Sequence, residues 1–382
     1  MRQVRRLVEG MRERAVELDV DGGFPSEDFR LLRANDLLGV MVPTELGGLG
    51  ASFSDYIEIA YHLGRGNGAV GLIFNMHACV TGALAAVSGD VAVELGAGDG
   101  YPVERDAILR AAAKGSLYAV AMSERGSGAR LTAMSTRYHR TANGFRIRGS
   151  KSFVSGAGHA DAYLVAARSA DDDRIVSQFL VPAGDGVTVR RTWDTMGMRA
   201  TGSHDLDLDV ELPETALLGG AENLTLPVAE AAPHWMIASY AAVYVGVARS
   251  AIEIAATDAT KRGLATLPNV RARIGRADAA CAAAHATLVE AARRVDDGDP
   301  EAGLWAWRAK LLAGDAAAAV TASMMEACGA SSIRRGHPLE RLFRDARCGA
   351  LQPATSDVCA DWLGVAALGG DPYRDTGKEQ RW

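Results

Sequence analysis

The chain has 382 residues, of which 48% are hydrophobic, and its formal net charge is −6. This length exceeds the ~50–200 residues of most single domains and predicts two or three packed units. The charge argues against nucleic acid and anionic membranes as partners, and no apolar run approaches the ~20 residues of a membrane span. The 5 cysteines include no CxxC pair, so we expect neither a metal site nor disulfides, and a cytoplasmic location.

Residues 1–115 have their apolar positions at helical spacing and predict an N-terminal helical domain. A helix should begin at Ser26, whose hydroxyl can cap it. The glycine-rich connector 43–50 separates this helix from two more, at residues 55–64 and 69–87.

Residues 116–222 are the one stretch with the character of β structure. Runs of strand-like residues at 117–122 and 144–156 are separated by glycine-containing turns. Polar and apolar residues then alternate without a break over 205–212, which is typical of a strand with one face in water. A middle β domain is therefore predicted between two helical blocks.

Residues 223–382 predict a C-terminal helical domain. The stretch 236–256 is apolar nearly all round, which indicates a buried central helix. Alanine-rich helices are expected at 270–297 and 304–328, and a last helix should begin near Ser356. Long antiparallel helices joined by short loops are typical of a bundle.

This order of domains, together with several short motifs, resembles the acyl-CoA dehydrogenase superfamily of flavoproteins. Each motif is weak alone, but their order matches over essentially the whole chain. The resemblance implies an N-terminal α-helical domain, a middle β-barrel-like domain and a C-terminal four-helix bundle. It also implies a homodimer or homotetramer that associates through the bundle. The motifs lie at residues 42–48, 122–124, 149–155, 196–199 and 344–346.

The resemblance implies a flavin, with FAD expected and FMN as the alternative, whose ring accepts hydride at N5. Two segments of this chain match the family segments that hold the ring, and a glycine after the first segment would let the backbone approach a phosphate. Taken alone, these segments are equally compatible with an ordinary turn and a core aromatic residue. The matching residues are Met122, Ser123 and Gly128 around the first segment and Phe153, Val154 and Ser155 in the second.

The distal half of the family's FAD site comes from a neighbouring subunit. Here the aromatic residue and the glutamine that usually belong to it are missing. The residues that resemble the rest of that site are Arg262, Gly329, Thr355 and Asp357.

The family's catalytic base is usually a glutamate two residues before a Thr-Ser pair. The pair here is Thr355-Ser356, and the residue at the base position is Pro353. Some relatives place the glutamate on the first long helix of the C-terminal domain, a position that falls near Met236. Neither residue can accept a proton. Carboxylates that could act as a displaced base near these positions are Glu230, Asp345, Asp357 and Asp361.

Among the eight histidines, His234 is the candidate catalytic residue. It lies near the start of the expected buried helix, where a neutral imidazole could act as a base or as a hydrogen-bond partner of activated oxygen. His77 and His204 are weaker candidates, and His159 matches a structural turn of the family. No histidine and carboxylate spacing predicts a metal site.

Three functions fit these residues. The first is α,β-dehydrogenation of a small acyl thioester, carried by CoA or by a carrier protein, with a displaced base and an electron-transfer partner. The second is a flavin-dependent monooxygenase of the same fold, which takes reduced flavin from a reductase partner, hydroxylates nitrogen or carbon and needs no such base. The third is a non-catalytic flavin-binding protein. The resemblance favours the first.

Overall fold

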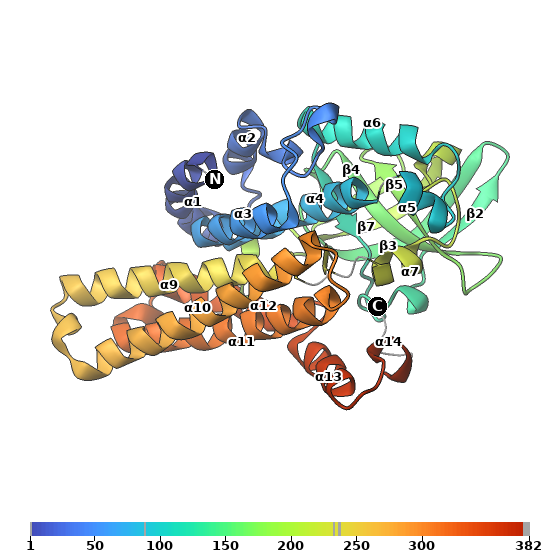
Figure 1. Cartoon of the computed structure of the whole chain (residues 1–382). Helices are drawn as coiled ribbons and strands as arrows, with labels where there is room; N and C mark the ends of the chain where they lie inside the picture. Colours follow the sequence, from blue (N-terminus) through green and yellow to red (C-terminus); the bar gives the residue numbers. More distant parts are fainter. Residues whose placement is uncertain (1, 88, 232–233, 236–237, 377–382) are drawn as a thin grey trace.

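The computed structural model describes residues 2–87, 89–231, 234–235 and 238–376. Helices form the N-terminal part, strands the middle and helices the C-terminal part (Figure 1). The N-terminal helices are α1 (Arg2–Asp21), α2 (Ser26–Ala34), α3 (Phe53–Gly66), α4 (Gly68–Ala86), α5 (Gly89–Glu94) and α6 (Tyr101–Ala113).

Local sequence explains several helix ends. Ser52 and Asp55 form a capping box at the start of α3, and the Asn67 side chain accepts a hydrogen bond from the first turn of α4. The predicted cap at Ser26 is wrong, because Pro25 is the N-cap and Ser26 is already helical. Its hydroxyl instead lies 3.5 Å from the carbonyl oxygen of Phe24.

The middle part is a 7-stranded sheet with strand order β1-β4-β2-β3-β7-β6, to which β5 is added along β4. The polar and apolar alternation seen in the sequence becomes β7, which pairs antiparallel with β3. A bulge between Lys151 and Val154 interrupts that pairing at the end of β3. The strands are β1 (Tyr118–Ala121), β2 (Arg137–Thr141), β3 (Gly144–Val154), β4 (Ala162–Ser169), β5 (Val176–Pro182), β6 (Val187–Arg190) and β7 (His204–Leu212).

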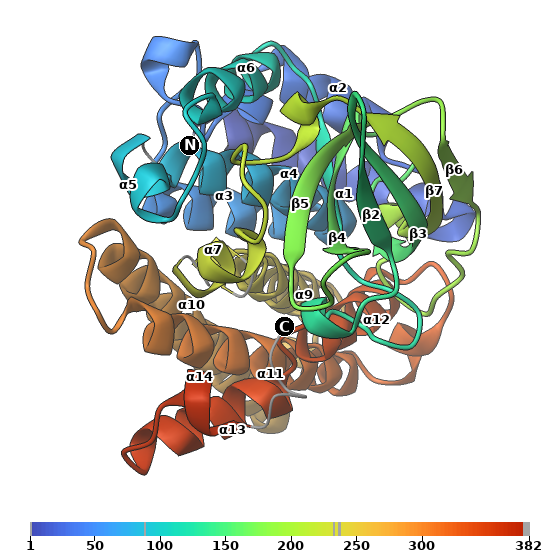
Figure 2. The ribbon, with the colours of Figure 1, turned by 90° about the vertical axis from the view of Figure 1, so that its right-hand side faces the viewer.

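Long helices that run side by side form the C-terminal part, and the sheet lies beyond one end of them (Figures 1 and 2). The alanine-rich face of α11 packs against α9, α10 and α12, as expected for a bundle. The predicted fold class is therefore confirmed. The helices are α7 (Thr225–Ala231), α9 (Ala241–Lys261), α10 (Pro268–Asp296), α11 (Ala302–Cys328), α12 (Pro338–Leu351), α13 (Ser356–Ala367) and α14 (Pro372–Asp375).

Two of the described helices, α4 and α11, are long and apolar enough to cross a membrane by length and composition alone. The expectation that no apolar run approaches the length of a membrane span is therefore wrong for these two helices. In α4, 78% of the most apolar window is buried inside the protein, and in α11 the share is 44%. Burial of this kind is also the property of a core helix, and α4 packs against α3, α6, α9 and β1.

Candidate functional site

A cleft of about 540 Å³ lies between the β sheet, helix α4 and the C-terminal helices. The lining side chains are mostly apolar, with hydroxyl groups on the wall formed by the β domain. The lining residues are Leu72, Met76, Cys79, Val120, Met122, Ser123, Gly128, Ala129, Leu131, Phe153, Ser155, Trp193, Thr195, Met196, Gly197, Met198, Ser203, Trp235, Tyr240, Cys348, Leu351, Gln352 and Pro353.

The two segments predicted to hold a flavin ring lie beside each other on one wall of this cleft. The backbone N–H of Ser152 donates a 2.8 Å hydrogen bond to the carbonyl oxygen of Ser123, which fixes the end of β3 against the turn after β1. Met122, Ser123 and Ser155 all line the cleft, and so does Gly128. Residues from distant parts of the sequence are thus brought together on one wall.

Phe153 stands out because its backbone φ angle is 58°, in the left-handed region that bulky residues rarely adopt. The β bulge at this point turns its side chain outward, and the residue is 64% exposed. Its ring meets the Trp193 ring edge-on, with the centroids 5.8 Å apart. A conformation of this kind costs about 1–3 kcal/mol and tends to occur at functional sites.

Val154 is placed differently from its neighbours. It is fully buried in the core of the β domain and pairs with His204 across the bulge. Its side chain does not line the cleft. Any contribution of Val154 to a ligand would therefore come from its backbone.

A buried ion pair supports this wall from behind. The Lys151 ammonium lies 2.8 Å from the Glu124 carboxylate, and both side chains are at most 3% exposed. Glu124 also accepts hydrogen bonds from the N–H and hydroxyl of Ser135 and from the N–H of Thr136. Burial opposes its ionisation, but Lys151 and these donors together lower the Glu124 pKa to about 2. Lys151 also donates to the carbonyl oxygen of Met122 at 3.4 Å.

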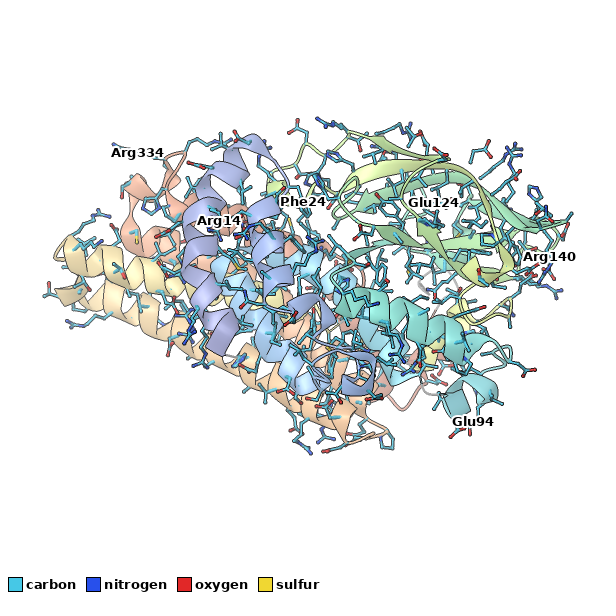
Figure 3. The ribbon with its side chains drawn as sticks, turned by 90° about the horizontal axis from the view of Figure 1, so that it is seen from above. Arg14, Phe24, Glu94, Glu124, Arg140 and Arg334 are labelled. Carbon is cyan, nitrogen blue, oxygen red and sulfur yellow. The ribbon has the colours of Figure 1, made fainter. Side chains whose placement is uncertain are left out.

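Figure 3 shows Glu124 inside the β domain and Arg140, which pairs with Glu214 and Glu222, at its outer tip. The pair of Lys151 and Glu124 therefore connects the two segments that line the cleft. The sequence alone did not predict this ion pair, because the two residues are 27 positions apart. The only signal was a lysine in a strand whose neighbours are partly apolar.

Three hydroxyl groups form a chain that starts at the cleft wall. The Oγ atoms of Ser155 and Ser203 lie 2.9 Å apart, and Ser203 Oγ lies 2.7 Å from Thr201 Oγ1. The Thr201 hydroxyl also lies 2.8 Å from the carbonyl oxygen of Met198. Ser155 and Ser203 face the cleft, whereas Thr201 lies fully buried behind them.

The opposite wall contains the position of the family's usual base. Pro353 lines the cleft, and its carbonyl oxygen accepts a hydrogen bond from the Tyr240 hydroxyl. Burial raises the pKa of Tyr240 well above its usual value, so the phenol stays protonated. Behind it, the buried Lys310 ammonium donates to the carbonyl oxygen of Gly349 at 2.8 Å.

None of the described carboxylates considered as a displaced base lines the cleft. Asp345 is buried behind the wall, where it accepts a 2.6 Å hydrogen bond from the N–H of Met198 and pairs with Arg341. Burial raises its pKa despite the nearby arginine. Asp357 and Asp361 are exposed. The Glu230 side chain and Met236 lie outside the described residues.

His234 does not line the cleft either. Its ring packs edge-on against Phe53 of α3, with the centroids 4.9 Å apart. Burial lowers its pKa to about 4, although Asp296 opposes this shift, so the imidazole is neutral near pH 7. The buried His77 joins two elements through Leu38 and Tyr118, and His159 stacks on Phe24, so both hold structure together.

Two of the residues resembling the distal half of an FAD site, Arg262 and Gly329, lie together at the C-terminal end of α11. Arg262 bonds to Asp258, to the carbonyl oxygen of Cys328 and to Ser331, next to the Gly329 that ends α11. Figure 3 places Arg334, close in sequence to this loop, well apart from Glu124 in the β domain. Thr355 caps α13, and none of these residues lines the cleft of its own chain.

The residues present fit a flavin ring in the cleft. Aromatic side chains at Phe153 and Trp193 offer apolar walls, and the hydroxyls of Ser123 and Ser155 offer hydrogen bonds at the edge. The nearby Ser127 Oγ is buried without a hydrogen-bond partner, which leaves a donor beside the positive-φ glycine Gly128. Among the described residues, no group of three or more His, Cys, Asp or Glu could hold a metal ion.

A second pocket, of about 90 Å³, adjoins the cleft and is also mainly apolar. It lies between α4, α5, α6, α7 and the sheet. The residues that line both spaces are Cys79, Val120, Met122, Leu131 and Trp235.

Comparison with known proteins gives consistent matches along the chain. Residues 1–90, 119–210 and 227–361 match the N-terminal, middle and C-terminal domains of acyl-CoA dehydrogenase. A putative acyl-CoA dehydrogenase, YdbM from Bacillus subtilis (strain 168), is 29% identical, and the match covers 96% of each chain. The amino sugar nitrososynthase DnmZ of Streptomyces peucetius is also 29% identical, over 92% of this chain and 88% of that protein.

Solved structures show the same fold. KijD3 in complex with FMN and a dTDP-linked amino-keto sugar has a TM-score of 0.85 and 26% identity, covering 98% of this chain and 94% of the other. FMN-bound TdsC from Paenibacillus sp. A11-2 has a TM-score of 0.83 and 25% identity, covering 96% of each. Butyryl-CoA dehydrogenase from Megasphaera elsdenii, at 22% identity, shares the fold with a TM-score of 0.84, covering 96% of this chain and 97% of the other. The chain therefore belongs to the acyl-CoA dehydrogenase superfamily.

Proposed function

We propose that this protein is a flavin-dependent monooxygenase that acts on an uncharged, largely apolar small molecule. Its relatives support an oxidoreductase without fixing the reaction. The observation that carries the choice is the lining of the cleft, which among the described residues contains no Asp, Glu, His, Lys or Arg. The same holds for the described residues of the adjoining pocket.

Dehydrogenation of an acyl thioester requires a base within hydrogen-bond reach of the Cα proton, about 2.6–3.2 Å. The cleft offers Pro353 at the usual position, and the Tyr240 hydroxyl is occupied by the carbonyl oxygen of that residue. The raised pKa of Tyr240 further disfavours it as a base. Oxygenation of a substrate does not require a base that removes a Cα proton.

The lining also limits the substrate. The backbone at Gly128 could approach the flavin phosphate. A further diphosphate or CoA phosphate is normally held by Arg or Lys, and none is found among the described lining residues. KijD3 was solved with a dTDP-linked sugar, whereas TdsC was solved with indole. The apolar cleft and its adjoining pocket favour a neutral compound closer in chemistry to the second.

The flavin would be FMN or FAD, held by Ser123 and Ser155 at its ring edge and by Phe153 on one face. When bound and reduced, it supplies the activation of O2. Trp193, Trp235 and Tyr240 would keep water out of the cleft. The distal half of an FAD site would come from a neighbouring copy in a homodimer or homotetramer, through its Arg262, Gly329, Thr355 and Asp357. The second partner would be a reductase that delivers reduced flavin.

Acyl thioester dehydrogenation is the second candidate. Its support is the similarity to YdbM and, at 28% identity, to a cyclohex-1-ene-1-carbonyl-CoA dehydrogenase of Geobacter metallireducens (strain ATCC 53774 / DSM 7210 / GS-15), which covers 93% of each chain. This function would require a base from outside the described lining and an electron-transfer partner. A non-catalytic flavin protein would instead bind the cofactor without turnover.

The proposal is tested by following flavin absorbance after protein-bound, chemically reduced FMN meets oxygen. We expect the absorbance of oxidised flavin to return slowly and in two phases, because an apolar, water-poor cleft protects the oxygenated state. A single fast phase at the rate of free reduced FMN would contradict the proposal. Phe153→Ala should shorten the slow phase by opening the cleft, whereas Phe343→Ala, on α12 and outside the cleft lining, should leave it unchanged.

A further inference from the structure

The hydroxyl groups of Ser155, Ser203 and Thr201 carry three protons. They make three contacts: Ser155 with Ser203, Ser203 with Thr201, and Thr201 with the carbonyl oxygen of Met198. Ser203 Oγ has two neighbours, Ser155 Oγ at 2.9 Å and Thr201 Oγ1 at 2.7 Å, but only one proton. The side chains of Ser155, Ser203 and Thr201 are at most 6% exposed. Because water has little access to them, the direction of each hydrogen bond constrains the next.

Two arrangements of these protons show what Ser155 can offer to the cleft. In the first, Thr201 donates to the Met198 carbonyl, Ser203 donates to Thr201, and Ser155 donates to Ser203. Ser155 then offers only lone pairs to the cleft. In the second, Thr201 donates to Ser203 and Ser203 to Ser155, which leaves the Ser155 proton pointing into the cleft. Here the 2.8 Å contact between Thr201 and Met198 is no longer a hydrogen bond.

The first arrangement keeps one more internal hydrogen bond than the second. The Met198 carbonyl oxygen also accepts from the Trp193 indole N–H and from the Thr201 backbone N–H, each at 3.1 Å. The Thr201 hydroxyl makes the shortest of these three contacts. The chain alone therefore favours the state in which Ser155 accepts, by about the net value of one hydrogen bond.

We propose that Thr201 and Ser203 are positioning residues that make Ser155 a hydrogen-bond acceptor toward the cleft and so favour reduced flavin. This inference rests on the proposed function, because it requires a flavin in the cleft with its N5 atom beside Ser155. A reduced flavin ring carries a proton on N5 and can donate there, whereas an oxidised ring can only accept at N5. A cleft with this bias suits a protein that receives its flavin already reduced.

The test is the ratio of the dissociation constants for oxidised and reduced FMN, measured by anaerobic titration, and in parallel for FAD. Thr201→Val and Ser203→Ala should each shift this ratio toward the oxidised form by about threefold to tenfold. A tenfold shift equals a fall of about 30 mV in the two-electron midpoint potential of the bound flavin. Thr201→Ser keeps the hydroxyl and should retain the wild-type ratio.

A matched control is available in α11. Thr321 is also fully buried and also donates to a backbone carbonyl, that of Ala317 at 2.8 Å, but it does not line or adjoin the cleft. Thr321→Val should leave the ratio unchanged. Equal weakening of both flavin forms in Thr201→Val would overturn the inference by showing a merely structural role. If the wild-type protein binds neither flavin, the proposed function itself fails, which separates the two outcomes.

Discussion

Replacement of Lys151 by Met is expected to lower the free energy of unfolding by about 3–5 kcal/mol. The substitution keeps the length of the side chain but removes the cation that faces the buried Glu124 carboxylate. The remaining donors, from Ser135 and Thr136, do not neutralise its charge. The loss is measured by urea unfolding at pH 7. The exposed Lys114→Met should change stability by no more than about 0.5 kcal/mol.

The same variant should respond differently to pH. In the wild-type protein the Glu124 pKa is lowered to about 2, so its stabilisation is present above the unfolded pKa of about 4.5 and is lost as pH falls toward 2. Without Lys151, burial raises this pKa instead. The difference in free energy of unfolding between the wild-type protein and Lys151→Met should therefore shrink as pH falls from 7 toward 4. A deficit independent of pH would show that lost packing, and not an unpaired carboxylate, causes it.

A double variant separates charge from shape. Lys151→Met combined with Glu124→Gln leaves no buried charge, and the single amide oxygen of Gln can still accept from the N–H and hydroxyl of Ser135. We expect it to recover much of the stability lost by the single variant. Because Lys151 also bonds to the Met122 carbonyl, the single variant should bind flavin more weakly as well.

Gly246→Ala is expected to destabilise the protein by about 2 kcal/mol or more. Gly246 in α9 and Gly64 in α3 lie where these two helices pack closely against each other. A Cβ atom on Gly246 would lie 2.1 Å from the carbonyl oxygen of Tyr61, and one on Gly64 would lie 2.1 Å from that of Val243. These are backbone atoms, so the helices would have to separate.

The control for this prediction is Gly275→Ala, in the middle of α10, where nothing lies within 4 Å of the added methyl group. It should stabilise the protein by about 0.5–1 kcal/mol, because alanine favours a helix over glycine. Thermal unfolding of the two variants should therefore shift in opposite directions. Equal shifts would show that the crossing of α3 and α9 tolerates a methyl group. Since Tyr240, the N-cap of α9, lines the cleft, Gly246→Ala should also weaken flavin binding.

The sequence predicted the fold well because its signals were local. Alternation over 205–212 became β7, and glycine at 329 ends α11 as expected from its position. Likewise, the segments at Met122–Ser123 and at 153–155 were found by their order and then met on one wall of the cleft. Short-range patterning of this kind is set by strand and helix periods, which a single sequence contains.

Features that depend on distant residues were not predicted. The hydroxyl chain joins Ser155 to Ser203, 48 positions away, and the Tyr240 hydroxyl reaches Pro353 across 113 positions. Neither pairing leaves a local pattern. The position of His234 before a buried helix makes it a candidate catalytic residue, but a position along the chain does not determine which way the ring points. It turns to Phe53, and the cleft is lined by Trp235 instead.

The most direct test of the account is anaerobic mixing of the flavin-loaded protein with a panel of acyl-CoAs while flavin absorbance is followed. Its central claim is that the described residues of the cleft include no base able to take a Cα proton. We predict that the flavin absorbance stays unchanged with every acyl-CoA. Bleaching with any of them would show that a base is present and would contradict the proposed monooxygenase function.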